Sequence, residues 1–241
     1  MTATRRRAAA VGACYLVTHV TSIAALALYT PVLNDAGWVT GPGPDTRILL
    51  GALFEVVLAL AVVGTAVLLL PAVRRHGESA AAGYVALRTL EAAVITVGVV
   101  ALLAVVTLRQ HPPAPGDTTT VARALVAVHD WTFLVGPNFV LGTNTILAAY
   151  LMLRSGLVPR AVAVLGLVGG PLILASAVAV LFGAYRQVSA AGSLTAVPVF
   201  AWELSLALYL LLRGFRPAAE PALNSLNTAD GAGQDAAPAL R

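Results

Sequence analysis

The sequence contains no lysine, a single cysteine and few charged residues of either sign. Only 11% of its 241 residues are charged, whereas a soluble domain carries about 25%. All 15 basic residues are arginines, and they form no basic face with interleaved aromatic residues of the kind that binds nucleic acid. Cys14 alone forms neither an intramolecular disulfide nor a cysteine cage for a metal. These absences exclude a disulfide framework and argue against nucleic-acid and metal partners.

The abundant residues are apolar, at 59% of the chain. A soluble core could not bury this much apolar surface, so we expect the lipid bilayer to be the solvent. A membrane-spanning helix needs roughly 20 mostly apolar residues, and proline, glycine and charge separate the windows that meet this condition. The six windows are residues 8–29, 48–70, 80–108, 121–153, 161–183 and 194–212. The sequence therefore predicts an all-α integral membrane bundle of six transmembrane helices.

The distribution of arginine predicts how the bundle is oriented. Nine arginines fall on one side of the membrane and four on the other, which also carries Asp35, Asp45 and Asp117. The positive-inside rule then places both termini in the cytoplasm, as expected for a multi-pass protein of a bacterial inner membrane. The larger group is Arg5, Arg6, Arg7, Arg74, Arg75, Arg154, Arg160, Arg213 and Arg216, and the smaller is Arg47, Arg109, Arg123 and Arg186.

The chain divides into a membrane domain and a tail. Residues 1–213 hold the six spans, whereas residues 214–241 are rich in alanine, proline and polar residues and are expected to form a disordered cytoplasmic tail. The first span resembles a signal peptide, because arginines precede its apolar run and the run contains an Ala-Leu-Ala motif at 25–27. Five further spans follow it, so we expect the first helix to be retained.

Polar residues interrupt five of the apolar windows and carry the functional hypothesis. A charged side chain at the bilayer centre costs about 2.5–3.5 kcal/mol on the insertion scale, so such residues are expected to mark a site. A rise of 1.5 Å per residue places the intramembrane acids and the first histidine in one layer, from the midplane into the outer half. The candidate buried polar site consists of His19, Glu55, Arg88, Glu91, His129, Asp130, Asn138, Asn144 and Glu203.

Local spacing suggests how some of these residues interact. Arg88 and Glu91 are three residues apart on one helical face and are expected to pair. Asp130 shares a side with Asn144, whereas His129 points about 100° away. Four acids face a single arginine, so we expect that some carry protons or that a cation lies among them. Pro137 removes a backbone donor and should bend its helix, leaving a carbonyl near Phe133 that needs another partner.

A structural interpretation of the same residues competes with the functional one. Polar residues inside a membrane also join helices, each pair contributing about 1 kcal/mol or less. His19 fits such a role, and if the fourth span began near Phe133, His129 and Asp130 would lie at the water boundary. Four acids in four helices are harder to explain by helix packing alone, which favours a functional polar cavity.

Several segments resemble a family of bacterial membrane proteins. The most specific are "LGALFEV" (50–56), "GYVALRTLE" (83–91), "HDW" (129–131) with the Gly-Pro pair that follows at 136–137, and "SGLVPR" (155–160). They resemble the family called domain of unknown function 4386, and the resemblance covers about residues 5–216. The resemblance implies a six-helix membrane architecture and no particular activity, so no catalytic residue follows from it.

Three functions are compatible with the sequence. A carrier of a small molecule, an ion or protons would use the acidic layer beside the break at Pro137, as transporters use discontinuous helices. A membrane enzyme or redox protein would use the acids for proton transfer or His19 and His129 as haem ligands. A structural or regulatory partner would use the polar layer for packing. The sequence names no cofactor and no cargo, and it leaves enzymatic activity open.

Overall fold

The computed structural model describes residues 2–112 and 118–216, and within them all regular structure is helical. The predicted tail lies almost entirely outside the described residues. Three short segments connect or interrupt the α-helices: the 3-10 turns Ala36–Val39 and Arg74–His76, and the π-helical segment Val135–Val140. The α-helices are α1 (Ala3–Asn34), α2 (Thr46–Val73), α3 (Glu78–Gln110), α4 (Thr118–Leu134), α5 (Leu141–Ser155), α6 (Arg160–Leu181) and α7 (Ala190–Leu212).

The six predicted spans are confirmed. Six continuous helical rods in the described chain are long and apolar enough to cross a membrane. The fourth rod, Thr118–Ser155, combines α4, the π-helical segment and α5. Most rods extend a few residues beyond the predicted windows, because helical hydrogen bonding continues into the polar residues that flank each apolar run.

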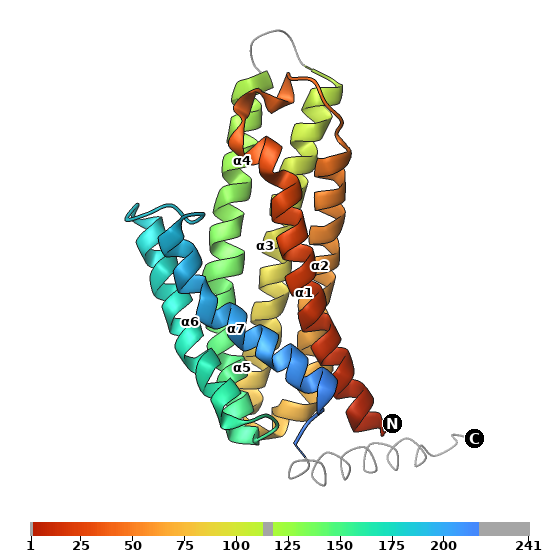
Figure 1. The fold of residues 1–241 in the computed structure, drawn as a ribbon, viewed down its shortest axis with the longest axis vertical. Coiled ribbons are helices and arrows are strands. Elements are labelled where there is room, and N and C mark those ends of the chain that lie inside the picture. Colours follow the sequence, from red (N-terminus) through yellow and green to blue (C-terminus); the bar gives the residue numbers. More distant parts are fainter. Residues whose placement is uncertain (1, 113–117, 217–241) are drawn as a thin grey trace, which may run out of the picture.

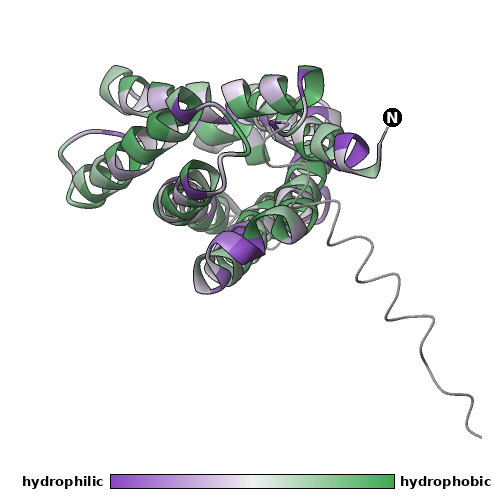
Figure 2. Ribbon diagram, turned by 90° about the horizontal axis from the view of Figure 1, so that it is seen from below, coloured by the Kyte–Doolittle hydropathy of each residue, from purple (hydrophilic) through white to green (hydrophobic). Residues whose placement is uncertain are grey.

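The helices pack in two groups (Figure 1). The long helices α1, α2 and α3 and the long fourth rod, which begins with α4, stand roughly upright, and α3 contacts α2, α4 and α5. The shorter α6 and α7 form a tilted pair that packs on α5 and on α1 and reaches only part of the way along α4. Apolar side chains such as Val20, Leu60 and Val100 are exposed on the outside, and the helical surface is largely hydrophobic (Figure 2).

Helix length indicates which part of the bundle matches the bilayer. The 22 residues of α6 span about 33 Å, close to the roughly 30 Å thickness of the hydrocarbon core. The 33 residues of α3 span about 50 Å. At the end of the bundle opposite the chain termini, α1–α4 therefore extend past the loop that joins α6 to α7 (Figure 1).

Both described chain ends lie at the same end of the bundle (Figure 1). There the Arg5 guanidinium donates hydrogen bonds to the carbonyls of Leu210 and Leu211, at 3.0 and 2.6 Å. These carbonyls are in the last turn of α7, where helical partners are missing. Arg5 therefore joins the start of α1 to the end of α7.

Glycine allows α5, α6 and α7 to approach closely. A Cβ atom on Gly166 would lie 2.6 Å from Nε1 of the fully buried Trp202, and one on Gly170 would lie 2.9 Å from the carbonyl oxygen of Gly142. Small residues promote such contacts in membranes, where dispersion forces rather than hydrophobic burial hold helices together. These contacts fix the positions of α5 and α7, both of which contribute to the polar site.

Candidate functional site

At the break in the fourth rod, two side-chain amides donate to the backbone carbonyl that Pro137 leaves without a helical donor. Proline has no N–H to offer the carbonyl of Phe133 four residues earlier. Asn138 Nδ2 donates to this oxygen at 3.1 Å, and Gln187 Nε2, from the loop between α6 and α7, donates at 3.2 Å. The expectation that a neighbour supplies the missing donor is confirmed. Asn138 thus stabilises the π-helical segment locally.

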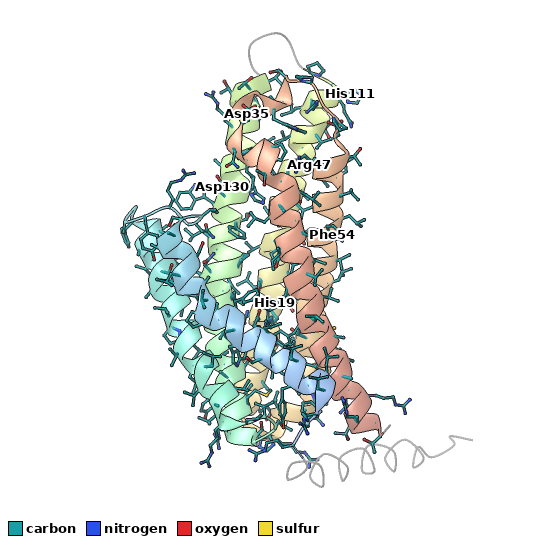
Figure 3. The ribbon with its side chains drawn as sticks, in the orientation of Figure 1. His19, Asp35, Arg47, Phe54, His111 and Asp130 are labelled. Carbon is teal, nitrogen blue, oxygen red and sulfur yellow. The ribbon has the colours of Figure 1, made fainter. Side chains whose placement is uncertain are left out.

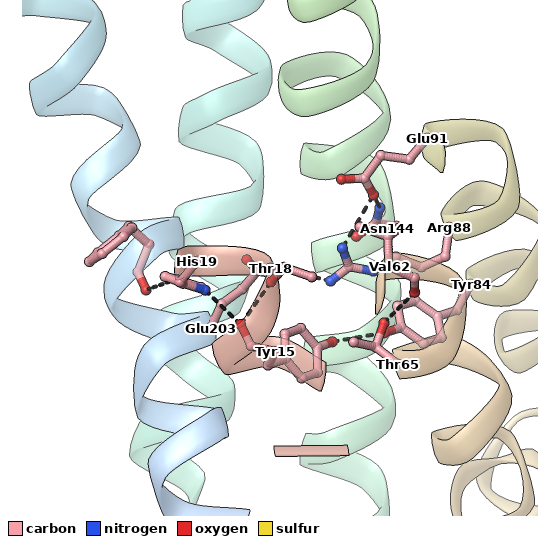
Figure 4. Close-up of polar contacts among 11 residues, drawn as sticks. Tyr15, Thr18, His19, Val62, Thr65, Tyr84, Arg88, Glu91, Asn144 and Glu203 are labelled. Carbon is pink, nitrogen blue, oxygen red and sulfur yellow. Dashed lines mark hydrogen bonds and ion pairs between the residues drawn. The ribbon is translucent and has the colours of Figure 1, made fainter. Parts of the chain in front are cut away.

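Arg88 lies at the centre of a buried ionic network (Figure 4). Its side chain is 2% exposed, and its Nη2 donates to Glu203 Oε1 at 2.6 Å while Nη1 donates to Glu91 Oε2 at 3.3 Å. Asn144 Nδ2 also donates to Glu91 Oε2, at 2.6 Å. The expected pairing of Arg88 with Glu91 is confirmed. The shorter contact, however, joins Arg88 to Glu203, which lies on α7 and is distant in the sequence.

Two tyrosines lie beneath the guanidinium. The hydroxyls of Tyr15 and Tyr84 are 2.7 Å apart, and the Arg88 Cζ atom lies 5.2 and 5.7 Å from their ring centroids. A cation over an aromatic face is stabilised by the ring quadrupole. Sequence reasoning did not include these tyrosines in the site, although Tyr15 and Tyr84 share helical faces with His19 and Arg88. That shared face is the signal that could have identified them.

His19 contacts two backbone carbonyls. Its Nδ1 lies 2.9 Å from the oxygen of Tyr15, and its Nε2 lies 3.4 Å from the oxygen of Phe200. The imidazole also packs against the Phe200 ring, with centroids 4.6 Å apart. Axial ligation of a haem by His19 would require the loss of one of these contacts, and the haem hypothesis remains untested.

A second polar group surrounds Glu55. The Tyr29 hydroxyl donates to Glu55 Oε2 at 3.0 Å. The ring of His129 meets the Tyr29 ring edge-on at 5.6 Å and lies parallel to the Phe133 ring at 6.4 Å. A Cβ on Gly98 would lie 3.4 Å from His129 Cδ2, so His129 lies near the level of Gly98.

The polar residues therefore form two groups rather than the single layer expected. Gly98 follows Arg88 by ten residues on α3, which corresponds to roughly 15 Å along the helix axis. The ionic network and the Glu55 group occupy different heights in the bundle.

A cavity of about 340 Å³ connects the two groups. Six of the nine predicted site residues line it, together with an apolar wall that includes Leu58, Val62, Ile95, Leu141 and Val199. Pro137 and Phe133 at the helix break also line the cavity. The six predicted residues are His19, Glu55, Arg88, Glu91, His129 and Glu203.

The expectation that Asp130 faces the bundle interior is wrong. Its side chain is 66% exposed, and it lines a separate depression with Arg186 and Gln187, beside the loop between α6 and α7. Figure 3 shows Asp130 on α4 near this loop. Successive helical residues point about 100° apart, and the neighbouring His129 occupies the inward face, so Asp130 points outward. Asn138 and Asn144 do not line the cavity either.

The fold and the site define a class of protein: a six-helix, multi-pass membrane protein with a largely apolar cavity between its helices that buried ionisable side chains also line. Residues 10–214 match the model of the family described as a domain of unknown function (DUF4386), and the chain belongs to this family. This confirms the resemblance observed in the sequence. No curated protein and no solved structure matches the chain.

Proposed function

We propose that this protein is a small-molecule carrier of the bacterial inner membrane and that the central cavity binds its cargo. The observation that carries the proposal is the combination of open space and buried ions. A cavity of about 340 Å³ fits the lower end of the range of roughly 300–1,000 Å³ that small-molecule sites occupy. Its polar floor is the ionic network of Arg88, Glu91 and Glu203.

A purely structural role explains the network less well than ligand binding does. Polar residues that only join helices are expected to be packed closely by neighbouring side chains, because each unfilled volume costs dispersion energy. Here three charged side chains border unfilled space. Among the described residues, the buried atoms Arg88 Nε and Asn144 Oδ1 have no hydrogen-bond partner. The ionic network therefore has hydrogen-bonding capacity that the described chain leaves unused, although of these two residues only Arg88 lines the cavity.

The helix break supports movement beside the cavity. The π-helical segment Val135–Val140 separates α4 from α5, and Pro137 within it lines the cavity. Transporters commonly place such discontinuous helices at the binding site, where a change in their geometry alternates access. A carrier would use this segment as the hinge between α4 and α5.

The test of carrier activity is transport by the purified protein in liposomes. We expect an imposed pH gradient or membrane potential to drive uptake of at least one solute from a mixture of small amines, carboxylates and neutral amphiphiles, measured by mass spectrometry. Uptake should clearly exceed that of protein-free liposomes. If neither solute nor protons move under either gradient, the carrier proposal is wrong.

The orientation has its own test. We propose that both termini are cytoplasmic, because arginine divides nine to four between the two sides. A reporter enzyme fused after Arg216 should therefore be active in the cytoplasm, and one inserted between Arg109 and Thr118 should be active outside the inner membrane. The reverse pattern would overturn the orientation.

A further inference from the structure

Three carboxylates line the cavity, and one of them, Glu55, forms no ion pair with a described residue. Glu91 and Glu203 both pair with Arg88, and Glu91 also accepts a hydrogen bond from Asn144. Glu55 is half-buried, and within the described part of the chain its single hydrogen bond comes from the neutral hydroxyl of Tyr29. Since Arg88 already faces two carboxylates, it supplies no surplus positive charge for Glu55.

Aromatic rings line the cavity beside this carboxylate. Tyr29 donates to it, His129 meets the Tyr29 ring edge-on, and Phe133 lies parallel to His129, with the centroid separations given above. Glu55, Tyr29, His129 and Phe133 all line the same cavity. A carboxylate combined with aromatic rings is a recurring arrangement for organic ammonium groups, because both the charge and the ring quadrupoles attract a cation.

His129 provides independent evidence that the group is incomplete. Its side chain is 6% exposed, and its buried Nδ1 atom has no hydrogen-bond partner among the described residues. The nearest charged atom to Nδ1 is Asp130 Oδ1 at 3.6 Å, which is too long for a hydrogen bond. Buried polar groups are normally satisfied, so the hydrogen-bonding capacity of this cavity-lining imidazole is not fully used within the described chain.

The side of the cavity bordered by α1 and α7 is hydrophobic. Ile23 and Leu26 of α1 and Phe200 of α7 line the cavity and are also exposed on the outer surface of the bundle. Figure 3 shows α1 and α7 converging toward the end of the bundle that holds the chain ends and diverging in the other direction, and a Cβ on Gly12 of α1 would lie 2.7 Å from the carbonyl oxygen of Ala207 of α7. Because lipid surrounds this part of the bundle, a molecule that enters between the two helices must be partly apolar.

We propose that the cargo is a lipophilic organic cation and that Glu55, with Tyr29, His129 and Phe133, binds its ammonium group. This inference rests on the proposed carrier function. The apolar part of the cation lies along Leu58, Ile95 and Leu141 toward the ionic network. A metal ion fits less well, since no group of three His, Cys, Asp or Glu residues in the described chain is arranged to hold one.

The experiment compares three probes of similar shape and different charge. These are phenyltrimethylammonium, its neutral isostere tert-butylbenzene, and the anion 4-tert-butylbenzoate, each titrated against the protein in lipid nanodiscs with empty nanodiscs subtracted. We expect saturable binding of the cation alone. Glu55→Gln should weaken its binding by about tenfold or more, whereas Glu78→Gln removes an exposed negative charge at the start of α3, away from the cavity lining, and should change it less than about twofold.

One further variant keeps the outcome interpretable. Phe133→Leu retains an apolar side chain but removes a ring, and it should weaken cation binding even if Glu55→Gln fails to fold. Equal binding of the neutral or anionic probe, or unchanged cation binding in Phe133→Leu and a folded Glu55→Gln variant, would overturn this inference and leave the carrier proposal standing. Carrier function itself fails separately, when the liposome assay shows no uptake of any solute class.

Discussion

Replacing Arg88 with alanine is expected to destabilise the protein by about 3–5 kcal/mol, the usual cost of removing one partner from a buried ion pair. The substitution leaves Glu203 without its contact at 2.6 Å and Glu91 without its contact at 3.3 Å. It also leaves a void over the rings of Tyr15 and Tyr84, which lose their contact with the guanidinium cation. Two carboxylates would then share a site of low dielectric without a counter-charge.

Related substitutions separate charge from geometry. Arg88→Lys should restore stability only partly, because an ammonium lacks the planar fork that reaches two carboxylates at once. The double variant Arg88→Ala/Glu203→Gln should be more stable than Arg88→Ala alone, since it removes one of the two carboxylates left without a counter-charge. The double variant Arg88→Ala/Glu91→Gln should regain less stability, because Asn144 still donates to the Glu91 carboxylate in the Arg88→Ala variant.

Thermal unfolding in one detergent measures these differences. The matched control is Arg75→Ala, which removes an exposed arginine at the end of α2 and should change stability by about 0.5 kcal/mol or less. Equal, small shifts for Arg88→Ala and Arg75→Ala would show that Arg88 is solvated. The ionic network would then not be a buried element of the site.

Filling the cavity should abolish transport without unfolding the protein. Ala196 lines the cavity from α7 and is half-buried, so Ala196→Trp places an indole in the space that the cargo would occupy. Val197, the next residue, is 55% exposed on the outside of the bundle. Val197→Trp therefore adds an indole to the same turn of α7 but directs it toward lipid.

We expect Ala196→Trp to lower solute uptake in liposomes by about tenfold or more, and Val197→Trp to lower it by less than about twofold. Uptake is measured at equal protein content, with thermal unfolding as the test that both variants fold. If a stable Ala196→Trp protein transports as well as the wild type, the cargo does not pass through this cavity. If both variants lose transport equally, the tilt of α7 rather than the cavity volume controls activity.

Much of the site geometry within single helices could be predicted from the sequence. The three-residue spacing of Arg88 and Glu91 puts them on one face in any α-helix, and the structure joins them. The missing N–H of Pro137 required another donor near Phe133, and Asn138 and Gln187 supply it. Both results depend on fixed helical geometry and on the bonding capacity of backbone groups.

The rotation of each helix about its axis was less predictable. Asp130 and His129 are neighbours, and either one could have faced the interior; the contacts of α4 with α3 turn His129 inward and leave Asp130 exposed. The apolar residues of α4 surround the whole helix, because one side faces lipid and the other faces protein. Hydrophobic periodicity, which identifies the buried face in a soluble protein, therefore gives little information here.

Composition and periodicity by themselves determined the class of protein, the six spans and the placement of polar residues within them, because the cost of polar groups in lipid acts on each segment separately. Tertiary structure alone decided that Glu203 of α7 approaches Arg88 more closely than Glu91 does, and that Tyr29 rather than an arginine contacts Glu55. It also decided that one cavity extends between the ionic network and the Glu55 group. These features depend on the tilt and rotation of packed helices, which the close contacts at Gly166 and Gly170 set and which no local pattern encodes.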